Sequence, residues 1–172
     1  MSSAVLPDRD TMIRELWDRQ QITDVMLRFG RGLDIHDWDL YANTLADPFE
    51  VDFYDLTGRP ATTTTPEVWA RFASACLERL LVMHQYSNFH IELDGDRASG
   101  IFYHVSRHRL PNRHGGDQYT QYGWYENSFG RGEDGWKITR LKHTFQWCDG
   151  NPTLIDLSDP DWQAAAAAVF DA

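Results

Sequence analysis

"HQYSNFHIELDGDRASGIFYHVSRHRL", residues 84–110, decides the fold class of this chain. Its first half has the composition of a β-strand that ends in the turn Asp94-Gly95-Asp96, and its second half predicts another strand. Two strands joined by so short a turn pair antiparallel. Because residues 119–129 and 136–147 continue the pattern, the sequence predicts a four-strand antiparallel meander.

The residues before the meander are mainly helical. Apolar residues recur at helical spacing from Met12 to Phe29, namely Ile13, Leu16, Trp17, Val25, Met26 and Phe29. A second helix is expected over residues 37–47, where Asp47-Pro48 predicts its end, and a strand over residues 49–55. Pro66 suits the first turn of a third helix that runs to Leu81.

This order of elements predicts one α+β domain over residues 1–172. Helices that come ahead of a meander pack on one face of a curved, mainly antiparallel sheet. The stretch from about residue 149 is expected to be a short Ala-rich helix or a tail.

Composition restricts the classes of partner. The net charge of −10 and the pI near 5.0 argue against nucleic acid and against an anionic membrane surface. Cys76 and Cys148 have no CxxC partner, and the N-terminus lacks the features of a signal peptide. No apolar run approaches membrane-spanning length, so we expect a cytoplasmic protein. Aromatic residues make up 13% of the chain, enough to build a core or to line a pocket for an apolar ligand.

The element order, with an aspartate after the first helix and a histidine after the third, resembles the SnoaL-like group of the NTF2-like superfamily. The segments "LDIHDWDLYANTLAD", "HQYSNFHIELDGDRA" and "GWYENSF…DGWKITRLKH" carry the resemblance. It is closest to the dehydratase-type members, which include scytalone dehydratase, bile acid 7α-dehydratase and hexachlorocyclohexane dehydrochlorinase. The resemblance implies an open cone with a cavity between the sheet and three N-terminal helices, and no metal or organic cofactor.

The same resemblance assigns a catalytic pair to Asp34 and His84. On the residues alone, an aspartate here is more often a helix cap and a lone histidine is more often structural. Asp37 and Asp39 are better placed to cap the following helix, which leaves Asp34 directed toward the core. In the resembled enzymes an aspartate bonds one imidazole nitrogen, and the other nitrogen removes a proton from carbon.

A second functional group is expected on residues 101–110. Alternation places one set of side chains on the same face, namely Phe102, His104, Ser106 and His108. This face is either exposed to solvent or a cavity wall that supplies a proton donor. His104 is the first candidate for that donor, before His108, which lies nearer the loop. His84, His104, His108 and Asp34 would supply three imidazoles and one carboxylate, which is a possible set of metal ligands. Nothing in the sequence fixes their geometry, so we expect no metal.

Candidates for the pocket lining are mostly aromatic: Phe29, Trp38, Phe53, Tyr54, Trp69, Tyr86, Asn88, Phe102, Tyr122 and Trp124. Phe29 stands five residues before Asp34, where the resembled dehydrochlorinase has Lys and the bile acid dehydratase has Tyr. The groups that assist the leaving group in those enzymes are therefore not reproduced here.

The resemblance, together with these residues, implies a cofactor-independent lyase of the dehydratase type, or an isomerase, acting on a small hydrophobic cyclic molecule. The alternatives are a non-catalytic ligand-binding or structural subunit, such as the small subunit of ring-hydroxylating dioxygenases, and a polyketide cyclase or hydrolase. Aromatic residues on the late strands predict an exposed apolar face, and therefore a homodimer or homotrimer: Trp124, Phe129, Phe145 and Trp147.

Overall fold

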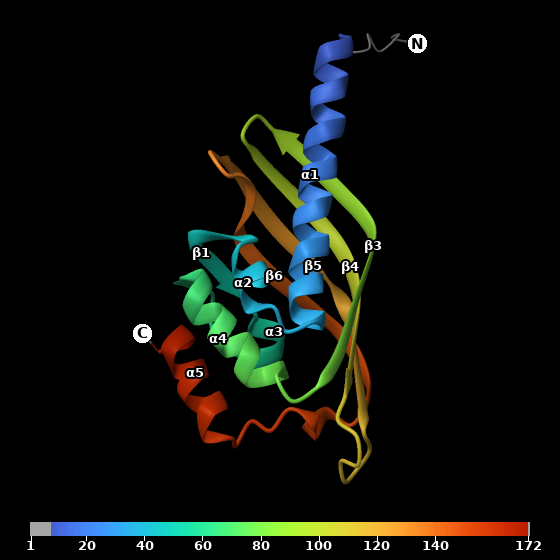
Figure 1. Ribbon diagram of the computed structural model, residues 1–172, viewed down its shortest axis with the longest axis vertical. Helices are drawn as coiled ribbons and strands as arrows, with labels where there is room; N and C mark the ends of the chain where they lie inside the picture. Colours follow the sequence, from blue (N-terminus) through green and yellow to red (C-terminus); the bar gives the residue numbers. More distant parts are fainter. Residues whose placement is uncertain (1–7, 172) are drawn as a thin grey trace.

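Helices cover one face of a curved six-stranded sheet in the computed structural model, which describes residues 8–171 (Figure 1). The helical elements are α1 (Arg9–Asp34), α2 (Trp38–Ala42), α3 (Tyr54–Thr57), α4 (Pro66–Leu77), the 3-10 turn η1 (Pro152–Leu154) and α5 (Pro160–Phe170). The strands are β1 (Leu45–Asp52), β2 (Thr62–Thr64), β3 (Leu81–Asp94), β4 (Arg97–Arg109), β5 (Gln118–Gly132) and β6 (Gly135–Gly150).

The predicted meander is confirmed by β3 to β6, each of which is antiparallel to its neighbour. The strand order across the sheet is β2-β1-β6-β5-β4-β3. β1 joins the sheet parallel to β6, and β2 pairs antiparallel with β1. The sheet is therefore mainly antiparallel, and the predicted fold class is confirmed.

The first part of α1 projects past one end of the sheet. Its N-cap is Asp8, whose carboxylate accepts hydrogen bonds from the backbone N–H groups of Asp10 and Thr11. Val25, Met26 and Phe29 are buried, but three of the earlier apolar residues are exposed: Ile13, Leu16 and Trp17. The reason is visible in Figure 1, where the first turns of α1 extend beyond the end of the sheet.

The segment between α1 and α4 differs from the prediction. The second helix is short because α2 ends at Ala42, and β1 already begins at Leu45, which pairs with Ile138 of β6. Asp47-Pro48 therefore lies inside β1, where the pairing with β6 is irregular between Leu45 and Glu50. A proline is tolerated at such an irregularity because its missing N–H removes no ladder hydrogen bond. The residues between α3 and Pro66 contain the short strand β2.

The inner face of the sheet is the face predicted from the alternation in β4. Its side chains are buried toward the helices: Phe102, His104, Ser106 and His108. Phe129 of β5 was expected among the exposed aromatic residues, but it is only 2% exposed and packs on Phe102, with ring centroids 5.8 Å apart. The expected exposure of Phe129 was therefore wrong.

The segment after β6 is part of the folded body. It crosses below the open end of the sheet and continues into α5, which packs beside α4 (Figure 1). α4 itself is held at its start by Thr65, whose side chain accepts the N–H of Val68, and by Pro66 in the first turn. The C-terminal residues thus close the space between the helices and the sheet.

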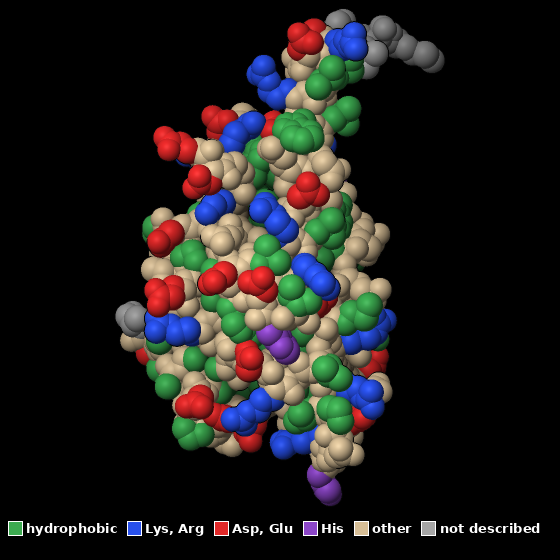
Figure 2. All heavy atoms as spheres, in the orientation of Figure 1, with side chains coloured by type: hydrophobic (Ala, Val, Ile, Leu, Met, Phe, Trp, Pro, Cys, Tyr) green, Lys and Arg blue, Asp and Glu red, His purple; other side chains and the backbone are tan. Residues whose placement is uncertain are grey.

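The molecular surface carries mixed charge. Figure 2 shows acidic and basic side chains interspersed over one face of the molecule, with no large area of a single sign. None of the helices within residues 8–171 is long and apolar enough to cross a membrane.

Candidate active site

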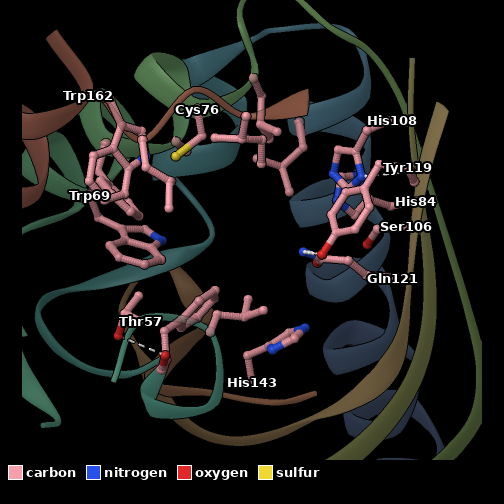
Figure 3. Close-up of a pocket in the computed structure, with 18 of the residues that line it drawn as sticks. Thr57, Trp69, Cys76, His84, Ser106, His108, Tyr119, Gln121, His143 and Trp162 are labelled. Carbon is pink, nitrogen blue, oxygen red and sulfur yellow. Dashed lines mark hydrogen bonds between the residues drawn. The ribbon is translucent and has the colours of Figure 1, made fainter. Parts of the chain in front are cut away.

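A cavity of about 270 Å³ lies between the inner face of the sheet and the helices. Figure 3 shows His84, Ser106, His108, Tyr119 and Gln121 along one wall, Trp69 and Trp162 on the opposite side, and His143 reaching in from below. Most of the remaining lining is apolar or aromatic: Leu33, Tyr41, Phe53, Leu56, Phe72, Ala73, Leu77, Tyr125, Pro152, Ile155 and Leu157. Such a lining suits a small hydrophobic ligand that is oriented by a few polar groups.

Asp34 and His84 are in direct contact beside this cavity. Asp34 is the last residue of α1, and its Oδ1 lies 2.8 Å from His84 Nδ1 and accepts the backbone N–H of His84 at 2.9 Å. The side chain of His84 is 5% exposed and that of Asp34 is 21% exposed. Because a carboxylate only accepts hydrogen bonds, Nδ1 carries a proton, and in the neutral ring Nε2 has the lone pair. His84 itself lines the cavity.

The neighbouring aspartates have the structural roles expected of them. Asp37 is the N-cap of α2, and its side chain accepts the N–H of Leu40 at 2.9 Å. Asp39 is exposed in the first turn of that helix. Asp34 is therefore the aspartate of this segment that reaches the cavity wall, through His84.

His108 faces the cavity next to His84. The two rings lie 6.1 Å apart, and Nδ1 of His108 is 3.3 Å from the carbonyl oxygen of Tyr119. A carbonyl only accepts, so Nδ1 holds the proton and Nε2 is the unprotonated nitrogen. Burial, and secondarily the nearby His84, lowers the pKa of His108 to about 4, so the ring is neutral at pH 7.

His104 lies one layer behind the cavity wall. Its Nδ1 is 3.0 Å from Ser106 Oγ, and its Nε2 is 2.7 Å from Nε2 of His143. His104 does not line the cavity, whereas His143 and Ser106 do. The expectation that His104 itself faces the substrate is therefore corrected. Burial lowers the pKa of His104 to about 3, with a further contribution from His143, and burial lowers the pKa of His143 to about 4.

His143 was missed because a β-bulge changes the parity of β6. Alternation from Trp136 and Ile138 would turn Arg140 inward. In the structure Phe129 pairs with Ile138 while Ser128 pairs with Arg140, so β6 has one extra residue at this point. From there Leu141 and His143 are buried on the inner face.

Two of the predicted lining residues belong to the cavity. Phe53 stacks on His143 with ring centroids 5.2 Å apart, and Trp69 donates its Nε1–H to Tyr41 Oη at 2.6 Å. Tyr125 and Tyr119 also line the cavity, although the prediction omitted them. Tyr125 could have been identified by applying the period of two to β5, because Gly123, Tyr125 and Asn127 share one face of this strand and are buried.

The remaining predicted lining residues lie elsewhere. Phe29 and Phe102 are core residues outside the cavity lining, and Tyr86 is partly buried against that core. Tyr54 is 60% exposed and Asn88 is exposed at the bulge in β3. Trp38 donates its Nε1–H to Glu78 on the surface of the helices. Tyr122 and Trp124 are on the outer face of β5, since the residues that alternate with them are the buried ones.

A metal centre was considered from His84, His104, His108 and Asp34. Within residues 8–171, no group of three or more His, Cys, Asp or Glu side chains has an arrangement that could hold a metal ion. In the structure each of these imidazoles is instead engaged in a hydrogen bond through at least one nitrogen: Asp34, Ser106, His143 and the Tyr119 carbonyl are the partners.

A curved sheet covered by N-terminal helices, with a cavity between them, places the protein in the NTF2-like fold class. The chain belongs to the SnoaL-like domain family, whose sequence profile matches residues 14–142. Comparison with the curated proteins gives no match.

Solved structures share this fold. The Kfla4162 protein from Kribbella flavida is 25% identical, with a TM-score of 0.75, and the match covers 78% of this chain and 95% of that one. A candidate scytalone dehydratase from Novosphingobium aromaticivorans is 17% identical, with a TM-score of 0.69 and coverage of 84% and 92%. A hexachlorocyclohexane dehydrochlorinase from Novosphingobium barchaimii is 17% identical, with a TM-score of 0.69 and coverage of 81% and 94%.

Proposed function

We propose that the protein is a cofactor-independent lyase that eliminates water, or a comparable leaving group, from a small, uncharged, hydrophobic cyclic compound. The observation that carries this proposal is the 2.8 Å contact between Asp34 Oδ1 and His84 Nδ1 at the wall of an apolar cavity. It leaves the second nitrogen of His84 free to act as a base toward a bound molecule.

The base would work as follows. His84 Nε2 removes a proton from a carbon of the substrate, and the positive charge that develops on the ring is stabilised by the adjacent carboxylate of Asp34. Asp34 also holds the ring in one orientation, because the same oxygen binds both the backbone N–H and the side chain of His84. The apolar walls exclude water, which strengthens these electrostatic interactions.

The charge of the cavity supports an uncharged substrate. Among the described residues, no Lys or Arg lines the cavity, and burial keeps His108 and His143 neutral at pH 7. A carboxylate or phosphate group bound here would lose its hydration without gaining a cation, which is costly. At about 270 Å³ the cavity is close to the lower end of the range of ligand pockets, which is about 300 Å³, and this favours a compact molecule.

Two other activities remain alternatives. An isomerase or cyclase would begin with the same proton removal, so substrate trials decide between these reactions and elimination. A non-catalytic binding or structural subunit would need no oriented base, so the contact between Asp34 and His84 counts against that role.

The proposal is tested with a panel of small cyclic compounds that carry a hydroxyl or halide one carbon away from an activated C–H bond. We expect His84→Ala and Asp34→Asn to lower turnover by at least about a hundredfold, the scale of losing a general base, without unfolding the protein. His90→Ala is the matched control, because the side chain of His90 is exposed and its Nε2 lies 3.3 Å from the exposed carboxylate of Glu92. Full activity in His84→Ala would refute the mechanism.

A further inference from the structure

Ser106, His104 and His143 form a continuous chain of hydrogen bonds behind the cavity wall. Ser106 Oγ lies 3.0 Å from His104 Nδ1, and His104 Nε2 lies 2.7 Å from His143 Nε2. Both ends of this chain reach the cavity, since Ser106 and His143 line it and His104 does not. Figure 3 shows Ser106 next to His84 on one wall and the ring of His143 entering from below.

The cavity end of the chain has an unpaired nitrogen. His143 Nδ1 is buried and has no hydrogen-bond partner among the described residues. A buried polar atom without a partner is costly and normally finds one. Because the ring lines the cavity, a bound ligand is the partner available to this nitrogen.

We propose that Ser106, His104 and His143 form a proton relay, in which His143 protonates the leaving group with the proton that His84 removes from carbon. The inference rests on the proposed function, because it supplies the acid for that elimination. His143 is then the second catalytic residue, and His104 and Ser106 act through it.

The proton removed from carbon and the proton given to the leaving group balance when the transfers run through this chain. His84 Nε2 takes a proton from carbon while the C=C bond forms and the C–O bond breaks. His84 passes this proton to Ser106 Oγ, whose residue is its cross-strand partner in the pairing of β3 with β4. The hydroxyl proton of Ser106 moves to His104 Nδ1, and the Nε2 proton of His104 moves to His143 Nε2.

The last transfer takes the Nδ1 proton of His143 to the departing oxygen, so the products are an alkene and water. One proton enters the chain and one leaves it. After product release, exchange with water in the cavity returns the two rings to their starting tautomers.

Neutral imidazoles suit this transfer. A neutral ring has one N–H and one lone pair, so it can accept a proton on one nitrogen and release one from the other. Burial lowers the pKa of His104 to about 3 and that of His143 to about 4, so neither ring holds a positive charge at pH 7. The short contact between the two Nε2 atoms has room for a single proton. When one ring carries its proton on Nε2, the other must therefore carry its own on Nδ1.

The relay predicts a dependence on the leaving group. Two substrates with the same ring are compared, one with a hydroxyl and one with a bromide on the same carbon, because bromide departs without being protonated. We expect His143→Gln and His104→Gln to lower turnover of the hydroxyl compound by about a hundredfold and that of the bromide by less than about threefold. His84→Ala should lower both. His90→Gln is the control and should lower neither.

These outcomes separate the two proposals. An equal loss on both compounds in His143→Gln, or no loss on either, overturns the relay even when His84→Ala is inactive. Normal turnover in His84→Ala overturns the proposed function itself.

A measurement without substrate tests the chain directly. In protein labelled with ¹⁵N-histidine, the proton between the two Nε2 atoms should give a strongly downfield N–H signal at neutral pH. We expect this signal to vanish in His104→Gln and in His143→Gln and to persist in His90→Gln. Its absence from the unmodified protein would refute the relay.

Discussion

Lowering the pH from 7 to 5 will destabilise the fold, because three buried histidines bind protons in the unfolded chain but not in the folded one. The pKa is about 3 for His104 and about 4 for both His108 and His143, against an ordinary value of 6.5. Between these values the unfolded chain holds more protons, so the free energy of unfolding falls as the pH falls. The contribution is nearly complete at pH 7, and as the pH falls it is lost progressively toward pH 4 for His108 and His143 and toward pH 3 for His104.

The magnitude follows from the size of the shift. One histidine whose pKa moves from 6.5 to about 4 loses about 2 kcal/mol of stabilisation between pH 7 and pH 5. Three such groups give an upper bound of about 6 kcal/mol, a large part of the 5–15 kcal/mol that stabilises a typical domain. The net charge of −10 works in the opposite direction, because acidification toward the pI of 5.0 reduces self-repulsion.

The assay is urea unfolding at pH 7, 6 and 5 for the unmodified protein and for His143→Phe. Phenylalanine keeps the stacking on Phe53 but cannot titrate. We expect the slope of unfolding free energy against pH to be smaller in the variant by up to about 1.4 kcal/mol per pH unit, the value for one proton. His90→Phe, at an exposed site, should keep the original slope. Equal slopes in the protein and His143→Phe would refute the reasoning.

Three further predictions concern stability and assembly. Asp18→Ala should cost about 3 kcal/mol and lower the melting temperature, because buried Asp18 accepts two hydrogen bonds from Arg131 at 2.8 Å; an unchanged melting curve would contradict this. Asp37→Asn should cost no more than about 1 kcal/mol in urea unfolding and leave turnover unchanged, since Asp37 only caps α2. We propose a homodimer or homotrimer through the outer face of the sheet, where Trp147 is 56% exposed. Sedimentation at micromolar concentration should give two or three times the chain mass of 19.9 kDa, and Trp147→Glu should shift the protein to monomer. A monomer alone in the unmodified protein would contradict this proposal.

Local pattern was enough to predict most of the fold. The alternation in β4 correctly separated its buried face from its exposed one, because a strand has a fixed period of two. The same rule fails for β6, where the bulge near Arg140 reverses the parity and brings His143 inward. Leu45 shows that distant pairing can also override a local pattern. Its spacing from the preceding residues predicted a helix, but it pairs with Ile138 of β6 and begins a strand.

The candidate site was only partly predictable for the same physical reason. Asp34 and His84 were paired by resemblance, since fifty residues separate them in the chain and only the fold brings them to 2.8 Å. The closure of the cavity by Ile155 and Leu157 depends on how the C-terminal segment turns back beneath the sheet, and no local periodicity encodes that path.

The distribution of partners around the cavity explains why one histidine is suited to be a base and the others are not. Among the four histidines His84, His104, His108 and His143, only His84 is bonded to a carboxylate, so positive charge that forms during proton removal is stabilised there. His104 and His143 are bonded to each other, and His108 to a carbonyl, so a charge on any of them would stay buried with no anion in contact. The same burial that lowers their pKa values therefore confines charge formation to His84 and leaves the remaining rings to accept and donate protons while neutral.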